Sequence, residues 1–115
     1  MILDGLKAAL DATGLRFALF GWSKKPEGDY GIIRPDDQLQ LRVDGDSCEE
    51  CMTRGYVDFF TRSRTRDEQR TIENALRSLG IAWQLQSIQF EPDTGFIHYE
   101  WRFTDTNGNA DVQGD

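Results

Sequence analysis

The sequence predicts an α+β fold in which a mostly antiparallel sheet carries two amphipathic helices on one face. Apolar and polar residues alternate strictly over Ile97–Phe103, which is the pattern of a strand with one buried face. Apolar residues recur at helical spacing in two other segments, one at the N-terminus and one after Thr65, as amphipathic helices require. Hairpin-type links dominate between the expected elements, whose order is α-β-β-β-β-α-β-β.

The first elements are one helix and two strands. The spacing of apolar residues predicts a helix over Ile2–Thr13, ended by Gly14, because glycine readily takes the left-handed conformation that follows a helix. The apolar run Phe17–Trp22 predicts a short strand buried on both faces. Tyr30–Ile33 predicts a second strand, which Pro35 should stop because proline has no N–H to donate.

The middle of the chain should hold two more strands separated by an acidic turn. Apolar residues alternate with polar ones over residues 39–43, predicting a third strand, and residues 44–50 form the turn. Thr53–Arg62 is the longest strand candidate, with Val57 and Phe59 on the face opposite Asp58. Gly55 within it indicates a bulge or a close backbone approach.

The C-terminal part should hold a helix and a hairpin. Thr65–Glu68 matches a capping box, and Gly80 should end the helix that follows. The next strand changes the parity of its apolar residues, which predicts a kink near Gln86–Ser87. Pro92–Gly95 has turn chemistry and leads into the alternating strand Ile97–Phe103. Residues 1–103 are thus expected to form one domain and residues 104–115 a flexible polar tail.

Composition excludes several classes of protein. The chain has 115 residues and a net charge of −7, and stable nucleic-acid binding normally needs a basic surface. No apolar run approaches the roughly 20 residues of a membrane span, and no signal peptide is recognisable. A soluble protein made in a cytoplasm is expected, without membrane association.

The single Cys-x-x-Cys motif, Cys48 and Cys51, is interpreted as a pair of incidental reduced thiols. Redox chemistry is disfavoured because acidic neighbours raise a thiol pKa. A zinc site needs four ligands, and only His98 is left to help. The Asp-x-Asp start of the acidic turn resembles a calcium loop but lacks its glycine and its final glutamate. No metal and no cofactor is therefore expected.

No catalytic residue is identified either. Nucleophile-elbow, Walker, Rossmann and His-Glu-x-x-His motifs are absent. His98 is the only histidine, and a cross-strand ion pair with acidic neighbours explains it best. Trp22, Trp83 and Trp101 are expected in the core rather than in a binding site.

Two oppositely charged segments are the candidate subunit interface. The acidic turn supplies Asp44, Asp46, Glu49 and Glu50, and a basic segment supplies Arg62, Arg64, Arg66 and Arg70. Two different patches on one chain allow the heterologous contacts from which rings are built. The alternative is that both segments are simply solvated.

Three segments together resemble the small tail-completion, or tail-terminator, proteins of long-tailed bacteriophages and prophages. They are Phe20–Ile32, Gly55–Arg62 and Asp93–Trp101, and the resemblance spans about Leu3–Phe103. What they share with that family is strand and turn pattern, not a catalytic signature.

The resemblance implies a structural, non-enzymatic subunit without cofactor. It would assemble with itself into a ring, typically a hexamer, at the head-proximal end of the tail tube, beside the head-side connector. It would be found in the virion tail, and in the host bacterial cytoplasm during assembly. The alternatives are another phage neck or minor capsid component, or a small enzyme or ligand-binding module using the polar sheet face around His98.

Overall fold

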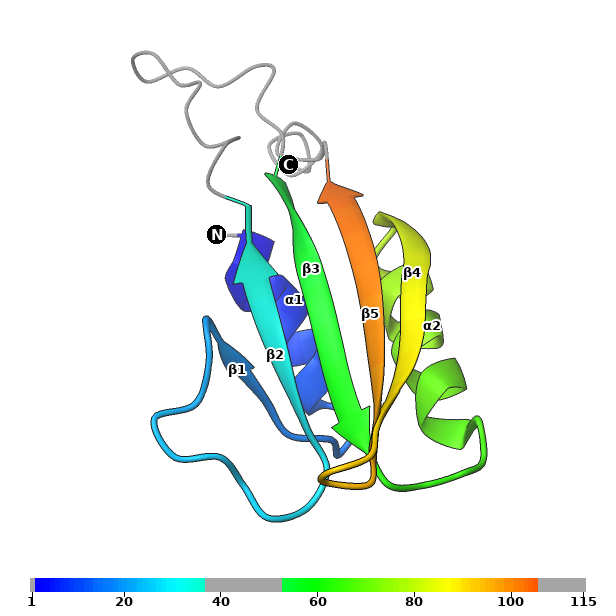
Figure 1. Cartoon of the computed structure of the whole chain (residues 1–115). Coiled ribbons are helices and arrows are strands. Elements are labelled where there is room, and N and C mark those ends of the chain that lie inside the picture. The colour runs from blue at the N-terminus through cyan, green and yellow to red at the C-terminus, as the bar shows by residue number, and fades with distance from the viewer. Residues whose placement is uncertain (1, 37–52, 106–115) are drawn as a thin grey trace, which may run out of the picture.

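The computed structural model describes residues 2–36 and 53–105, which form two helices and one five-stranded sheet (Figure 1). The strands lie in the order β1-β2-β3-β5-β4. All neighbours are antiparallel except β1 and β2, which are parallel. The α+β prediction with a mostly antiparallel sheet is confirmed. The predicted strand over residues 39–43 lies outside the described residues. The elements are α1 Ile2–Asp11, β1 Phe17–Leu19, β2 Tyr30–Pro35, β3 Thr53–Thr61, α2 Asp67–Ser78, β4 Ala82–Glu91 and β5 Phe96–Asp105.

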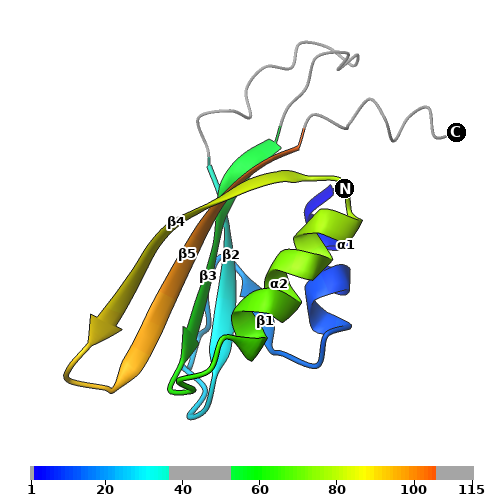
Figure 2. The same cartoon turned by 90° about the vertical axis from the view of Figure 1, so that its right-hand side faces the viewer.

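Both helices cover the same face of the sheet, as predicted (Figure 2). The core between the two layers is built around Trp101 of β5, which is fully buried. Its indole Nε1 donates a hydrogen bond to Glu73 Oε2 of α2 at 2.9 Å, so the helix is attached to the sheet by a polar bond inside an apolar contact. The other buried members of the core are Leu6, Leu10, Phe17, Ile33, Val57, Phe59, Ile72, Leu76, Ile81, Tyr99 and Phe103.

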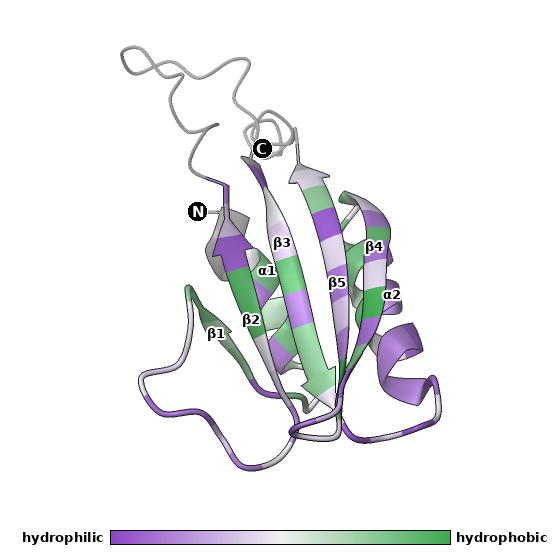
Figure 3. Cartoon of the chain, in the orientation of Figure 1, coloured by the Kyte–Doolittle hydropathy of each residue, from purple (hydrophilic) through white to green (hydrophobic). Residues whose placement is uncertain are grey.

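The two central strands, β3 and β5, have one apolar and one polar face. Apolar and polar bands alternate along both strands in Figure 3. Val57 and Phe59 point into the core, while Asp58 lies on the opposite face beside Glu100 of β5. Gly55 sits where the strands approach closely, because a Cβ there would lie 2.3 Å from the Arg34 carbonyl oxygen. The predicted alternation and the predicted close approach are both confirmed.

Helix α2 ends as predicted but starts differently. Gly80 follows the helix with a positive φ of 73°. The capping box at Thr65–Glu68 was wrong: the helix begins at Asp67, and its N-cap position, Arg66, makes no side-chain cap bond. The Thr65 hydroxyl instead lies 3.1 Å from the Ser63 hydroxyl in the turn before the helix. Asp67 and Glu68 in the first turn provide the negative charge that a helix N-terminus favours.

Strand β1 is shorter than the apolar run Phe17–Trp22 predicted. Phe20 adopts a φ of 71°, so the extended conformation stops at Leu19. The strand is also not buried on both faces, since Ala18 and Leu19 are only half-buried; Phe20, just after it, is 71% exposed. The Trp22 indole is half-buried and donates a hydrogen bond to the Gly31 carbonyl at 2.9 Å.

Strand β2 is longer than predicted, since it continues through Arg34 and Pro35. The backbone groups of Gly31 and Ile33 point toward the β1 side, where they bond Arg16 and Phe20. Pro35 is two residues after Ile33, so its backbone nitrogen also points toward the β1 side. Strand β1 has already ended there, so no carbonyl of β1 needs an N–H from this position. The proline therefore removes no ladder bond and does not stop the strand.

The C-terminal hairpin contains the predicted irregularity. The pairing of β4 with β5 shifts between Leu85 and Ser87, which is the bulge expected at Gln86–Ser87. Gly95 closes the turn with a φ of 79°. Strand β5 runs two residues beyond Phe103, so Thr104 and Asp105 belong to the sheet rather than to the predicted tail. They pair with the start of β3, which holds them in the ladder.

Replacing Leu76 by alanine should lower the free energy of unfolding by about 2–5 kcal/mol, because it deletes buried methyl groups and leaves a cavity. Leu76 is fully buried between α2 and the sheet. Urea denaturation measures the loss. Asn74→Ala, an exposed position on the same helix, should change stability little. A loss below about 0.5 kcal/mol at Leu76 would mean that the helix is not packed as described.

Candidate functional site

The face of the sheet opposite the helices, called here the polar face, carries most of the ionisable groups that could act chemically. Its side chains come from alternate residues of β2, β3, β5 and β4 and are aligned in rows by the strand register. Three rows run across the strands: Tyr30, Phe60, His98 and Gln89; Ile32, Asp58, Glu100 and Ser87; and Arg34, Tyr56, Arg102 and Gln84.

Asp58 is the centre of an ionic network on this face. Its side chain is nearly fully buried. Arg34 donates two hydrogen bonds to the carboxylate, from Nε to Oδ2 at 2.5 Å and from Nη2 to Oδ1 at 3.2 Å. The same guanidinium reaches Glu100 Oε2 at 2.8 Å. His98 Nε2 lies 2.9 Å from Asp58 Oδ1. Strands β2, β3 and β5 are thus joined by side chains as well as by their backbone ladders.

The network changes the acidity of its members. Burial alone would raise the pKa of Asp58, but the hydrogen bonds from His98 and Arg34 favour the carboxylate more strongly, and the pKa ends below its ordinary value. The hydrogen bond to Asp58 raises the pKa of Arg34. Both groups are therefore held in their charged forms, which suits a structural ion pair rather than proton transfer.

His98 is packed as well as paired. Its ring stacks on Phe60 with 4.2 Å between centroids, and Phe60 stacks in turn on Tyr30 at 4.7 Å. Phe96 meets both Tyr30 and Phe60 edge-on. The predicted ion pair of His98 with an acidic neighbour is confirmed, with Asp58 as the neighbour. The stacking fixes the orientation of the imidazole in the sheet.

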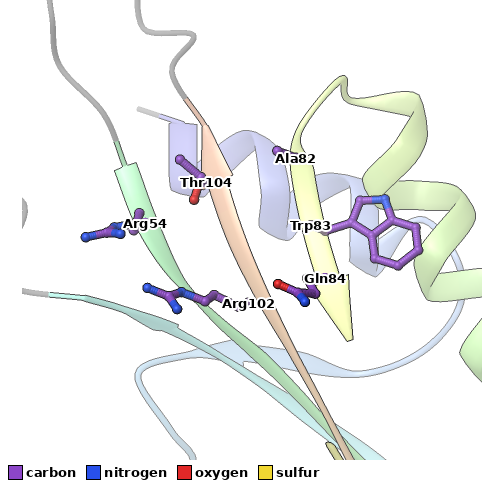
Figure 4. A pocket seen from close by; sticks show the side chains of 6 residues that line it. All are labelled: Arg54, Ala82, Trp83, Gln84, Arg102 and Thr104. Atoms are coloured by element: carbon purple, nitrogen blue, oxygen red, sulfur yellow. The ribbon is translucent and has the colours of Figure 1, made fainter. Parts of the chain in front are cut away.

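A depression of about 380 Å³ lies at the far end of the polar face from His98 (Figure 4). It is lined by Arg54 of β3, Arg102 and Thr104 of β5, and Ala82, Trp83 and Gln84 of β4. In Figure 4 the Trp83 indole points away toward α2, whereas the polar side chains lie along the strands. Two guanidinium groups, an amide and a hydroxyl thus bring several hydrogen-bond donors to this depression.

The basic segment is exposed, but two of its arginines also contact the fold. Arg62 donates to the Thr94 carbonyl at 2.9 Å and lies over the Phe96 ring at 4.1 Å. Arg64 lies over the ring of Phe90 at 5.6 Å. Arg66 and Arg70 are exposed at the start of α2. The structure therefore places Arg62 and Arg64 against the β4–β5 hairpin and Arg66 and Arg70 at the start of α2.

The acidic half of the candidate interface, Asp44, Asp46, Glu49 and Glu50, lies outside the described residues, as do Cys48 and Cys51. In the sequence, the acidic segment precedes β3 and the basic segment follows it.

Large apolar side chains are exposed at both outer edges of the sheet. Next to β1, Phe20 is 71% exposed and held in the left-handed backbone region. On β4, Phe90 and Ile88 are 53% and 44% exposed, although their parity places them on the helix side of the sheet, opposite Ile97 and Tyr99. Figure 2 shows the reason: the β4–β5 hairpin curves away from α2 toward its turn, so no helix covers them.

Other kinds of site find no support in the part of the chain that is described. Among residues 2–36 and 53–105, no three His, Cys, Asp or Glu side chains are grouped so that they could hold a metal ion. None of the described helices is both long enough and apolar enough to cross a membrane.

Sequence reasoning missed three features of these surfaces. Arg34 was missed because its strand was expected to end one residue earlier. Arg54 and Arg102 were missed because only the pairing register of β3 and β5 brings them to one end of the polar face. Phe20 was missed because its positive φ has no signal in an apolar run. The glycine that follows it was the single hint of irregular backbone.

The chain matches no protein-family model, and no curated protein shows significant similarity to it.

Replacing Asp58 by asparagine should lower the free energy of unfolding at pH 7 by about 1–3 kcal/mol, because the amide cannot satisfy both Arg34 and His98. The folded pKa of Asp58 lies below its ordinary value of 3.8, so its stabilising effect is complete above that value. It is lost as the pH falls through the folded pKa. The difference between wild type and variant should therefore be constant near neutrality and shrink at acid pH.

Urea denaturation at pH 7 and at several values below pH 4 gives this difference. Asp93→Asn, in the exposed β4–β5 turn, removes the same charge and should have little effect at any pH. A difference for Asp58→Asn that stays constant or grows on acidification would show that the carboxylate does not stabilise the fold through its charge.

Proposed function

We propose that this chain is a structural subunit that assembles with copies of itself into a closed ring, as a tail-completion or tail-terminator protein of a long-tailed phage or prophage. The observation that carries the proposal is the exposure of large apolar side chains at opposite edges of one sheet, Phe20 beside β1 and Phe90 on β4. Two different edges with exposed apolar side chains on one chain favour head-to-tail contacts between subunits. Such contacts form a closed ring when the rotation from one subunit to the next divides a full turn.

The β1 edge supports the proposal through its backbone. Phe20 is a bulky residue at a positive φ, a conformation that costs of order 1–3 kcal/mol and persists mainly where function requires it. The result is an aromatic ring displayed to solvent instead of buried. A partner surface that covers this ring would offset the cost.

The β4 edge supports the proposal because its sequence lacks the residues that usually protect an exposed edge strand. Exposed edge strands are usually protected by lysine, proline or inward-pointing charge. The ten residues of β4, Ala82–Glu91, contain no lysine, arginine or proline and no acidic residue before the last. Its outer edge has no partner strand among the described residues. Such an edge is suited to contact with another subunit.

The charged segments complement the apolar edges. Arg64 lies over Phe90, so the basic segment borders the apolar patch of β4 as a polar rim. In the proposed ring, the basic segment of one subunit faces the acidic segment of its neighbour, so that each subunit uses both segments. Rim charges of this kind mainly set association rate, register and salt sensitivity.

The phage assignment rests on the resemblance of Phe20–Ile32, Gly55–Arg62 and Asp93–Trp101 to the tail-completion family. In that role the ring, a hexamer in the family, would sit on the tail tube and meet the head-side connector. The role is non-enzymatic, and the charged groups around His98 are tied to one another in a manner that suits structure. Another neck or minor capsid component would use the same edges.

Purified protein should form assemblies larger than the 13.2 kDa chain, with a size that depends on concentration. Sedimentation velocity across a concentration series measures the mass, and electron microscopy of the largest species shows whether it is a ring. A monomer at all concentrations up to the millimolar range would contradict self-assembly by this chain alone.

Replacing Phe20 by glutamate and, in a second protein, Phe90 by glutamate should each abolish assembly, because each variant loses one half of a head-to-tail contact. Mixing the two should restore one intact contact per pair and give a one-to-one dimer that cannot grow further. Light scattering on separate and mixed samples tests this.

Gln89→Glu is the matched control, since it adds the same charge on β4 at an exposed position of the polar face and should leave assembly intact. Circular dichroism and urea midpoints confirm that each variant is folded. If one of the phenylalanine variants still dimerises alone, the contact joins identical edges and the head-to-tail geometry is wrong.

Reversing Arg64 and Arg66 to glutamate should weaken assembly, most strongly at low salt, and leave the monomer folded. A matching reversal of Glu49 and Glu50 to lysine should partly restore it, because the attraction between the two segments is rebuilt with exchanged signs. Association constants at two salt concentrations are compared. Wild-type assembly by the reversed arginine variant at low salt would mean that these charges are only a solvated surface.

A further inference from the structure

We infer that the depression between Arg54 and Arg102 binds an oxyanion, a carboxylate or phosphate group carried by a ligand or partner. This site lies on the polar face and uses neither the exposed Phe20 and Phe90 nor the basic segment, although Ala82, Trp83 and Gln84 in its lining belong to the edge strand β4. It also differs from the ionic network around Asp58, which lies nearer the middle of the same face.

The strand register brings the two arginines together. Arg102 pairs with Tyr56 and Arg54 pairs with Thr104, so the arginines are diagonal neighbours on β3 and β5 with the same outward parity. Diagonal neighbours lie about 7–8 Å apart at their backbones, within reach of long side chains. Figure 4 shows both side chains with Gln84 and Thr104 on the strands that line the depression.

The charges of these two arginines are not neutralised within the described structure. Arg34, in the same cross-strand row as Arg102, is compensated by Asp58 and Glu100. No carboxylate of the described residues forms an ion pair with Arg54 or Arg102. Two like charges at neighbouring positions of a sheet repel each other. The register therefore places two positive charges side by side on this part of the polar face.

One donor in the depression is buried and unsatisfied. Arg54 Nε is shielded from solvent and has no hydrogen-bond partner. Leaving such a donor unpaired costs about 1–3 kcal/mol, and more when the group is charged. A bound anion that pairs with the two guanidinium groups offsets their mutual repulsion, and a turn of the Arg54 side chain toward the depression would let Nε donate to it.

The donor set defines the class of ligand. Guanidinium groups match the two oxygens of a carboxylate or phosphate with paired N–H bonds. The Gln84 amide and the Thr104 hydroxyl add uncharged donors at the border of the same space. A volume of about 380 Å³ exceeds what one free anion fills, so the oxyanion is expected to be part of a larger molecule.

The test is an NMR titration of the full-length, ¹⁵N-labelled protein with inorganic phosphate and, separately, with triglutamate, at constant ionic strength. The arginine Nε–H signals of the site are assigned from Arg54→Lys and Arg102→Lys. Both signals should move saturably with at least one probe. The probe with the lower Kd identifies the chemical source as phosphate or carboxylate.

Replacing both arginines by glutamine should weaken binding about tenfold or more, since a charge-assisted hydrogen bond contributes at least that factor to an affinity. The Gln84 side-chain amide and the Thr104 backbone amide report binding in this variant. Lys25→Gln, which removes one positive charge from the exposed loop between β1 and β2, is the control and should bind as the wild type does.

The single lysine variants keep the inference testable if the double variant does not fold. They preserve the charge but lose the paired geometry, so each should bind less tightly than the wild type. Shifts that stay linear without saturation for both probes would overturn the site. So would equal affinity in wild type and double variant, because general screening would then explain the response.

Discussion

The exposed side of this sheet depends on a single buried carboxylate. Asp58 stands on the central strand of the sheet, with no helix above it, and is nearly inaccessible to solvent because Arg34 and His98 cover it. An unpaired charge so shielded would be strongly unfavourable. The covering residues come from the strands on either side, so satisfying this one group also determines how β2 and β5 are aligned against β3. The polar face is ordered by this requirement together with the aromatic stacking of Tyr30, Phe60 and His98.

The helical side uses the reverse arrangement, with one polar bond inside an apolar layer. Trp101 fills the centre of the core, and the Glu73 carboxylate accepts from both its indole and the Gln69 amide, at 2.9 and 3.1 Å. Burial of the ring stabilises the fold but does not fix the orientation of α2, because the hydrophobic effect is non-directional. The hydrogen bond fixes that orientation, since only one rotation and one translation of α2 bring Glu73 to the indole nitrogen. On each face of β5, a specific polar interaction thus fixes how the neighbouring element is aligned, and the other contacts contribute mainly to stability.

The parts of the fold that the sequence predicts are those governed by local chemistry. The alternation around Tyr99, the positive-φ glycines that end the helices and the parity change at Gln86–Ser87 are properties of neighbouring residues, and all of them are confirmed. The errors share a different cause. Pro35 is tolerated because of where β1 ends, and Thr65 lies one residue before the N-cap, where its hydroxyl contacts Ser63 and accepts from the Asp67 amide at 3.4 Å. The Arg54–Arg102 site likewise exists only through the β3–β5 register. Each depends on a contact between segments, which a pattern in one segment does not contain.

The bulge in β4 limits how the sequence of this strand can vary. The one extra residue between Leu85 and Ser87 reverses the parity of everything that follows it. Ile88 and Phe90 therefore lie on the helix side, and Gln89 shares a row with His98. If Gln86 took a regular place in the ladder, the two sets would be exchanged, with both apolar side chains on the face of the histidine and the glutamine where the apolar patch now lies. Loss of the codon for Gln86 would instead remove the bulge and leave Ile88 and Phe90 on the helix side, because the remaining residues already pair in regular order. A homologue that lacks this residue should thus keep apolar residues at the positions of Ile88 and Phe90 without compensating substitutions, whereas one that keeps the residue must keep the bulge.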